Sequence, residues 1–516
     1  MLIRLFAAVS IFAAFFPSIA FAAPGDDSRI NIVRLAARGG QVIGAASGCK
    51  EIAPLRIQAI KARVTELIEG SSAKKEDATF LLEMFESSLA GGQRAVAAGQ
   101  VMCDAAERDL AALEKSTPMG QPAGATAARS SQETVTAAVP PSQVVRGVNE
   151  KEIRFGISAP FTGPARELGN QMKIGIETAF AATNEAGGVN GRMLRLIAAD
   201  DGYEPTRTAE TMKQLYEKDQ VFGVVGNVGT PTAAVAIPYA LERKMLFFGG
   251  FTGANILRRD PPDRYVFNYR ASYAEETEAV VNYLVKIRRL KPDQIAVFAQ
   301  QDSFGDSGFS GVSKAIRNLR GGEAATVVRL NYKRNTLDVD EAVNQLKTLP
   351  NIRAIVMVAT YRAAAKFIEK TRLQYPQMIY TNVSFVGSTA LADELMLLGP
   401  RYAKGVIVTQ VVPAVNDYSS VILEYKTALN KHFPGVAPDY VSLEGYISAK
   451  VLIEGLRRAG PQLDVERVVE ALESMRDYDM GLGAPISFTR SKHQGVNKVW
   501  GTQLTEEGKY ESIELE

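Results

Sequence analysis

The order of the predicted elements constrains this chain more than any other feature of its sequence. From residue 152 onward, short apolar runs alternate with stretches that carry apolar residues at helical spacing. Residues 153–158 and 194–199 are predicted strands, and residues 169–182 and 206–218 are predicted helices. This alternation predicts parallel strands joined by right-handed crossovers, and therefore an α/β fold.

The same alternation continues almost to the end of the sequence. Further strands are predicted at residues 294–299, 325–330, 354–360, 384–388, 405–410, 485–489 and 498–504. This is more buried strands than a single sheet usually contains. We therefore expect two α/β lobes.

Two stretches, residues 221–233 and 244–253, are the candidate ligand cradle. Each is an apolar run that stops in glycine and hydroxyl residues, with Thr230 in the first, and Gly250 and Thr252 in the second. Ligands of open α/β sheets bind just outside the carboxyl ends of the strands. The sequence therefore predicts a site for a small polar ligand here. The alternative is two ordinary turns between strand and helix.

The first 22 residues have the pattern of a signal peptide. A positive residue, Arg4, precedes an apolar core, and residues 20–22 form a small-x-small cleavage site. The alternative is an uncleaved membrane anchor. No later stretch is long and apolar enough to span a bilayer, so we expect an exported, periplasmic protein.

Residues 29–114 are predicted to form a small all-α region, a helical hairpin or bundle. Cys49 and Cys103 are the two cysteines of the chain, and export to an oxidising compartment predicts a disulfide between them; the alternative is two buried thiols. We expect Cys49 near a helix start and Cys103 late in the last long helix. Residues 115–149 are rich in Pro, Gly, Ala, Ser and Thr, which predicts a disordered linker.

The composition and motifs argue against several functions. The net charge of the 516 residues is +2, which does not indicate a nucleic-acid binder. No Walker A loop, GxSxG elbow or HExxH motif occurs, and His432 and His493 lie in unrelated contexts, so we predict no enzyme, no cofactor and no metal site. The pair at residues 200–201 suggests either a metal-binding acid pair or a strand-end turn that caps the next helix, and the turn is favoured.

A family resemblance rests on several segments in order. Residues 153–164, the Gly-Gly-Val-Asn-Gly turn at 187–191, the acid pair at 200–201, the turn at 226–232 and residues 298–308 together resemble the type I periplasmic ligand-binding proteins. The branch that they resemble most is the leucine/isoleucine/valine-binding one that serves ABC transporters. The resemblance covers about residues 150–516 and leaves the helical region outside.

The resemblance implies a fold and a function. In that family two Rossmann-like lobes of parallel sheet, joined by three hinge crossovers, close around a small ligand. The crossovers would fall near residues 270–272, near 409–411 and past 488. Lobe one would hold about 150–270 and 411–487, and lobe two about 271–410 and 488–516. Such a protein captures an amino acid or a related small carboxylate or amide and delivers it to an ABC transporter permease.

The resemblance also implies particular ligand contacts. The hydroxyls of Thr230 and Thr252 and the main chain of Gly250 would hold a carboxylate, since hydroxyls and amides are suitable donors. Phe304 and Tyr361 would contribute from the second lobe. The complete predicted set is Val228, Thr230, Gly250, Thr252, Phe304, Tyr361, Ser388 and Thr389.

Two departures from the family pattern leave the ligand open. The acidic residue that meets a ligand ammonium should fall near Thr389, which is not acidic; Asp393 or Glu394 would be the substitutes, about one helical turn away. Leu168 replaces an aromatic residue. A carboxylate or amide without an ammonium group therefore fits as well as an amino acid.

The sequence also allows a second function, which does not involve transport. In this second interpretation the same two-lobed domain would act as a ligand-sensing or envelope-regulatory module. Residues 29–148 would then dock an envelope partner, because an ordinary transport protein does not need them.

Overall fold

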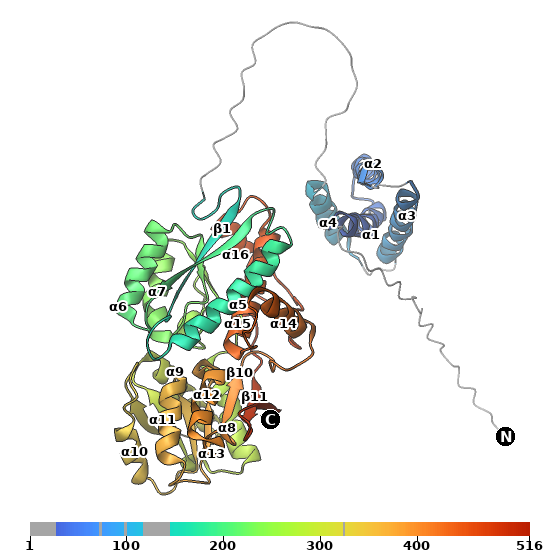
Figure 1. The fold of residues 1–516 in the computed structure, drawn as a ribbon. Coiled ribbons are helices and arrows are strands. Elements are labelled where there is room, and N and C mark those ends of the chain that lie inside the picture. The colour runs from blue at the N-terminus through green and yellow to red at the C-terminus, as the bar shows by residue number, and fades with distance from the viewer. Residues whose placement is uncertain (1–26, 72–74, 98–100, 117–144, 324–325, 516) are drawn as a thin grey trace, which may run out of the picture. The chain divides into compact units, whose positions relative to one another are not determined.

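The computed structural model describes residues 27–71, 75–97, 101–116, 145–323 and 326–515 (Figure 1). The predicted signal peptide and most of the predicted linker lie outside these residues. The chain divides into two compact units, Met1–Ala137 and Ala138–Glu516. No helix among the described residues has the length and apolar character needed to cross a membrane.

The first unit is helical. Its helices are α1 (Asp27–Ser47), α2 (Pro54–Ser71), α3 (Lys75–Ala97) and α4 (Cys103–Ser116). A disulfide joins Cys49 to Cys103, with 5.6 Å between their Cα atoms. Cys49 follows the end of α1 and Cys103 begins α4, so the expected positions of both cysteines within their helices were wrong. The bond ties the end of α1 to the start of α4.

Lobe one of the second unit is built on a five-stranded parallel sheet in the order β2-β1-β3-β4-β5. Its strands are β1 (Glu152–Ala159), β2 (Met193–Asp200), β3 (Gly223–Val225), β4 (Leu246–Phe248) and β5 (Val266–Phe267). The helices are α5 (Arg166–Glu185), α6 (Pro205–Lys213), α7 (Thr230–Glu242), α14 (Ser420–His432), α15 (Tyr440–Ala459) and α16 (Val465–Glu473).

Lobe two is built on a seven-stranded sheet in the order β12-β11-β10-β9-β8-β6-β7. Its strands are β6 (Ile295–Gln300), β7 (Val328–Tyr332), β8 (Ala354–Val358), β9 (Ile379–Asn382), β10 (Ile407–Gln410), β11 (Trp500–Leu504) and β12 (Tyr510–Ile513). Strands β6 to β10 pair in parallel, and β11 and β12 add an antiparallel edge. Its helices are α8 (Tyr273–Asn282), α9 (Ser303–Leu319), α10 (Asp340–Lys347), α11 (Tyr361–Thr371), α12 (Ser388–Leu398) and α13 (Pro400–Ala403).

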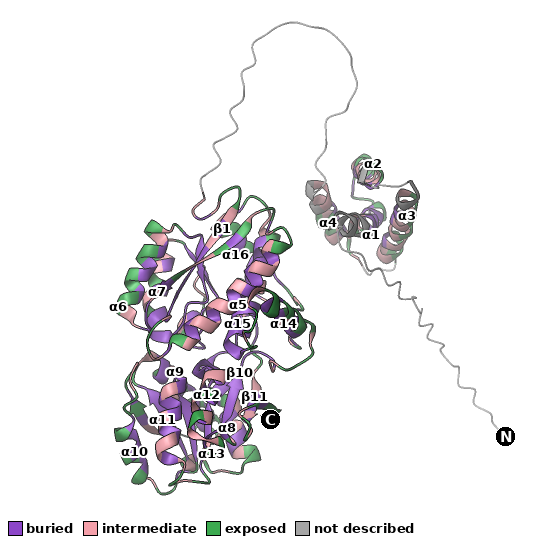
Figure 2. Cartoon of the chain, viewed as in Figure 1, coloured by how far each residue is buried: buried purple, intermediate pink, exposed green. Residues whose placement is uncertain are grey.

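The two-lobed α/β fold is therefore confirmed. Most strand residues are buried, except in the edge strands β2, β7 and β12, and the outer faces of the helices are exposed, as expected for sheets covered by helices (Figure 2). The chain passes between the lobes after β5, after β10 and before β11, where Gly495 and Val496 donate backbone hydrogen bonds to residues 268 and 269.

Two predicted strands were wrong. Residues 384–386 form a single 3-10 turn, and the strand lies earlier, at Ile379–Asn382. Gly387 adopts a left-handed backbone with a φ of 78°, which breaks an extended run. Residues 485–489 make only isolated bridges, Tyr478 with Ile486 and Thr489 with Lys492.

Candidate functional site

The carboxyl ends of β3 and β4 lie side by side, because the two strands are neighbours in the sheet. A parallel bridge between Val228 and Phe251 extends this pairing into the two loops. Thr230 starts α7, and its Oγ1 atom lies 2.7 Å from Oγ1 of Thr252. The amide of Thr252 donates to the carbonyl of Gly250. The chain thus brings the three predicted carboxylate contacts together at a helix N-terminus, which favours negative charge.

This group of residues is deeply buried. Thr230 is 2% exposed and Thr252 is fully buried, so the two hydroxyls satisfy each other inside the protein. One of the two hydroxyls must accept from the other. Oγ1 of Thr252 also accepts from the Ala254 amide at 3.2 Å, and the Tyr273 hydroxyl interacts with the same side chain, so the pair has further partners within the protein.

Aromatic rings from both lobes pack beside this group. Phe385 of lobe two stacks on Phe251 of lobe one, with ring centroids 5.0 Å apart, and lies 4.6 Å from Phe304. Tyr203 of lobe one lies 6.0 Å from the same Phe385 ring. Phe304 thus lies where the lobes meet. The sequence analysis missed Phe385 and Tyr203, since no local pattern distinguishes them from core residues.

A cavity of about 220 Å³ opens where the two lobes face each other. Lobe one contributes residues from α5 and the start of α15, and lobe two contributes the start of α11 and one face of α12. Its lining residues are Arg166, Glu167, Gln171, Tyr361, Arg362, Thr389, Ala390, Asp393, Glu394, Leu397 and Asp439. The predicted Tyr361 and Thr389 are among them. Because both lobes line the cavity, closing the lobes completes it.

The cavity is acidic. Glu394 pairs with Arg362 at 3.1 Å and Glu167 pairs with Arg166 at 3.1 Å. Asp393 makes no ion pair with any described residue; burial raises its pKa, and the carboxylates of Glu167 and Glu394 raise it further. Asp393, a predicted substitute for an acid at Thr389, thus lines the same cavity as Thr389.

Asp439 adds a buried acid from lobe one. Its Oδ1 atom accepts from the amides of Val441, at 2.7 Å, and Ser442, at 3.1 Å, and so caps α15. Burial raises the pKa of Asp439, and a hydrogen bond from the Thr389 hydroxyl opposes that shift. Asp439 was not predicted as a site residue; an acidic helix cap is the common structural role for such a residue.

Two polar atoms at the cavity are buried without a good partner. Oε1 of Gln171 has no hydrogen bond within the described chain. The Tyr361 hydroxyl approaches the backbone of Glu167 but forms no well-aligned hydrogen bond there. Leaving a buried polar atom unpaired costs about 1–3 kcal/mol, so such atoms in a cavity are suited to a polar ligand.

A buried charge cluster holds the first crossover. Arg270, 1% exposed, donates to Oε1 of Glu276 in lobe two at 2.7 Å and to Oε1 of Glu444 in lobe one at 3.2 Å. It also donates to the Ser384 hydroxyl. One guanidinium therefore joins elements of both lobes at the hinge.

The carboxylates of Asp200 and Asp201, at the end of β2, hold the turn that follows and the start of α6. Asp201 is buried and accepts from the amide of Tyr203, at 2.9 Å, and from the hydroxyls of Ser158 and Thr208. Burial raises its pKa to about 6. Burial would also raise the pKa of Asp200, but hydrogen bonds, led by that of Thr162, lower it to about 2.

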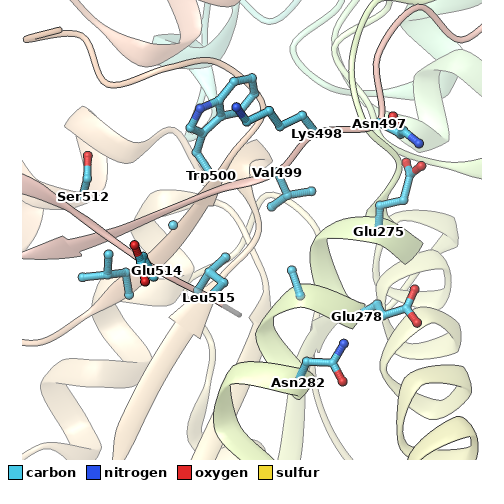
Figure 3. A pocket seen from close by; sticks show the side chains of 13 residues that line it. Glu275, Glu278, Asn282, Asn497, Lys498, Val499, Trp500, Ser512, Glu514 and Leu515 are labelled. Atoms are coloured by element: carbon cyan, nitrogen blue, oxygen red, sulfur yellow. The ribbon is translucent and has the colours of Figure 1, made fainter. Parts of the chain in front are cut away.

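Two further hollows lie on the hinge side. One, of about 660 Å³, is bounded by Glu275, Glu278 and Asn282 of α8, which face Val499 and Trp500 (Figure 3). The other, of about 730 Å³, shares Lys498 and Trp500 with it. The predicted ligand residues line neither hollow.

The structure offers little for metal or histidine chemistry. Within the described ranges, no group of three or more His, Cys, Asp or Glu residues is placed to hold a metal ion. His493 stacks on Phe267 with 3.7 Å between ring centroids, and its Nδ1 atom lies 2.9 Å from the Val266 carbonyl oxygen. His432 lies 3.6 Å from Glu185. The contacts of both histidines are therefore those of residues that support the fold, and neither lines the cavity between the lobes.

Residues 152–509 match the family model described as periplasmic binding protein, so the chain belongs to that family. A solved structure titled a possible leucine/isoleucine/valine-binding protein from Rhodopirellula baltica SH 1 is 39% identical, with a TM-score of 0.67; the match covers 71% of this chain and 97% of that one. A substrate-binding periplasmic protein from Ralstonia solanacearum is 28% identical, with a TM-score of 0.64, covering 70% and 100%.

A curated relative agrees with these structures. The Leu/Ile/Val-binding protein homolog 3 of Brucella melitensis is 26% identical over 341 residues, which cover 64% of this chain and 86% of the relative. These relatives are solute-binding proteins and not enzymes, and the predicted family is confirmed. The match begins at residue 152, so the helical unit lies outside it.

Proposed function

We propose that this chain is a periplasmic solute-binding protein that captures an amino acid, or a related small carboxylate or amide, by lobe closure and delivers it to an ABC transporter permease. The observation that carries the proposal is the cavity lined from both lobes, which includes the predicted Tyr361 and Thr389; the paired hydroxyls of Thr230 and Thr252 do not line it. Family membership and relatives named for leucine, isoleucine and valine support it.

The charges suggest how such a ligand would lie. A carboxylate would bind at Thr230, Gly250 and Thr252, where hydroxyl donors and the start of α7 favour negative charge. A polar or ammonium group would bind at the acidic cavity, where Asp393 is unpaired among the described residues. An amino acid carries both kinds of group, whereas a carboxylate without an ammonium group would use the threonine end alone.

A thermal-shift screen of the exported chain tests this proposal. Leucine, isoleucine and valine are compared with their amides and with the corresponding acids that lack the amino group. A ligand at about 100 times its dissociation constant should stabilise the protein by roughly 2.7 kcal/mol. Stabilisation by leucine alone supports recognition of both ends, and equal stabilisation by the acid without an amino group supports the carboxylate end only. If no member of a wider panel of amino acids, aromatic acids and amides shifts the unfolding, solute capture is refuted.

The alternative is a ligand-sensing or envelope-regulatory module. The disulfide-linked helical unit favours it, because it lies outside the family match and has its own core of buried residues. Deleting residues 29–148 separates the two functions. Transport of the ligand should survive the deletion if the chain serves a permease, and signalling or partner binding should be lost if the helices dock a partner.

A further inference from the structure

One loop of lobe one reaches lobe two with three consecutive residues. The Asn335 side chain of lobe two donates to the Gly202 carbonyl at 3.1 Å and to Oε1 of Glu204 at 2.6 Å. Arg334 donates to Oε2 of Glu204 at 3.0 Å. Tyr203, between them, accepts from the Gln300 side chain at 3.2 Å. We call residues 202–204 with Arg334 and Asn335 the clasp.

The loop is built to present these groups. The side chains of Asp200 and Asp201 accept from the amides of Gly202 and Tyr203 and so fix the turn. Tyr203 has a φ of 62°, in the left-handed region that bulky residues rarely adopt. Gly229 makes room for its ring, since a Cβ atom there would lie 2.2 Å from Cε2 of Tyr203. A strained bulky residue persists only where the surrounding structure fixes it.

In lobe two, the Arg334 side chain of the clasp is also fixed by its neighbours. Arg334 is held between two carboxylates, Asp302 of its own lobe at 2.9 Å and Glu204 of lobe one at 3.0 Å. The side chains of Arg334 and Asp302 are 23% and 14% exposed and that of Glu204 is 39% exposed, so the pair between the lobes is only partly shielded from solvent. Opening the lobes would leave Arg334 with Asp302 alone and would free Glu204.

We propose that the clasp sets the closed-state population of the two lobes, and thereby scales the affinity for every ligand by one common factor. Glu204 and Arg334, the two residues that the experiment changes, do not line the 220 Å³ cavity and do not belong to the predicted ligand contacts, so their pairing would stabilise closure without recognising a particular ligand. Affinity falls in proportion to the population of the binding-competent state. The affinity part of this inference rests on the proposed function, and the conformational part does not.

The experiment measures closure directly in the full chain. Spin labels at Glu210→Cys on α6 and Glu341→Cys on α10 report the distance between the lobes by double electron–electron resonance, while the native cysteines stay in their disulfide. The distances are recorded without any added solute for the wild type, Glu204→Gln, Arg334→Gln and the double variant. We expect each single variant to move population to longer distances, and the double variant to add little, because both remove the same pair.

A matched control separates the clasp from general loss of charge. Asp306→Asn breaks an ion pair of 2.7 Å with Arg329 that lies wholly within lobe two, and should leave the distances unchanged. Distances that stay unchanged in Glu204→Gln and Arg334→Gln overturn the proposal. So does an opening in Asp306→Asn as large as theirs.

Binding supplies the second readout. For any solutes that the thermal screen identifies, Glu204→Gln should weaken each by the same factor, about three- to fivefold, as for an ion pair of modest strength. Weakening of one ligand only would make Glu204 a ligand contact and refute the common factor. If no solute binds but the variants still open the lobes, the proposed function fails and the clasp stands.

Discussion

The two glutamates that contact Arg270, Glu276 and Glu444, differ in how many hydrogen bonds their carboxylates accept. Glu276 accepts from Arg270, from the amide and hydroxyl of Ser384 and from the Thr409 hydroxyl. Among the described residues, Glu444 accepts hydrogen bonds from Arg270 alone, and these are longer, at 3.2 and 3.4 Å. Burial therefore dominates at Glu444 and raises its pKa to about 7, although Arg270 opposes the shift.

This asymmetry predicts a pH-dependent stability. The folded pKa of Glu444 lies above its ordinary value of 4.5, so the folded state binds more protons between pH 4.5 and 7. Stability from this residue is therefore lost as the pH rises through that window, by on the order of 3 kcal/mol. Glu444→Gln, which mimics the neutral acid, should be more stable relative to the wild type at pH 8 than at pH 5. Urea unfolding at both values measures this, and parallel pH profiles would contradict it.

Substitution of Thr252 tests whether the carboxylate of a ligand binds at the paired threonine hydroxyls. Thr252→Ala removes one of the two paired hydroxyls and should weaken a carboxylate ligand by about 1–3 kcal/mol. Thr232→Ala is the matched control on α7, the helix that starts at Thr230, because the Thr232 hydroxyl donates to the carbonyls of Val228 and Gly229. Titration calorimetry compares the two variants. Equal affinity in both would show that the carboxylate does not bind at Thr252.

At the scale of elements, glycines set how closely α1 and α3 approach. A Cβ atom on Gly44 would lie 2.0 Å from the Leu89 carbonyl oxygen, and one on Gly92 would lie 2.1 Å from that of Gln41. Backbone therefore packs against backbone at this contact, and no side chain can shift to relieve a clash. The adjacent Gly91 has no atom within 4 Å of its Cβ position.

The two neighbouring glycines make a sharp test. Gly92→Ala should destabilise the helical unit by more than about 2 kcal/mol, as overpacking against backbone does. Gly91→Ala should be neutral or stabilise it by up to about 1 kcal/mol, since alanine is the better helix former. Thermal unfolding followed by circular dichroism compares them. Equal effects of the two substitutions would mean that α1 and α3 are not in this contact.

At the scale of the whole molecule, the two units have separate cores. The buried residues of the helices form one cluster, and those of the two lobes form others. Both cysteines of the sequence lie in the helical unit, and the lobes contain none. The disulfide therefore stabilises one unit alone.

Calorimetry should resolve this independence. Reduction of the Cys49–Cys103 bond removes about 2–4 kcal/mol from the helical unit and should lower its transition by roughly 10 °C or more. The transition of the lobes should stay in place and should respond only to added ligand. A single transition that moves with reductant would show that the units unfold together.

The sequence determined the α/β alternation, the two lobes and the neighbouring ends of β3 and β4, because apolar periodicity and strand-end glycines are local signals. It misplaced the strand near residue 384, where only the pairing of β9 with β8 and β10 shows which residues extend. It also brought Tyr361, Thr389 and Asp393 forward as candidates.

The tertiary structure alone decided what these residues face. Asp439 lies across the cavity from Asp393 only because α15 packs on α5, and Phe385 meets Phe251 only because the lobes close. The clasp likewise joins residues 202–204 to residues about 130 positions later. Contacts between such distant residues depend on the packing of whole elements, which no local pattern of amino acids encodes.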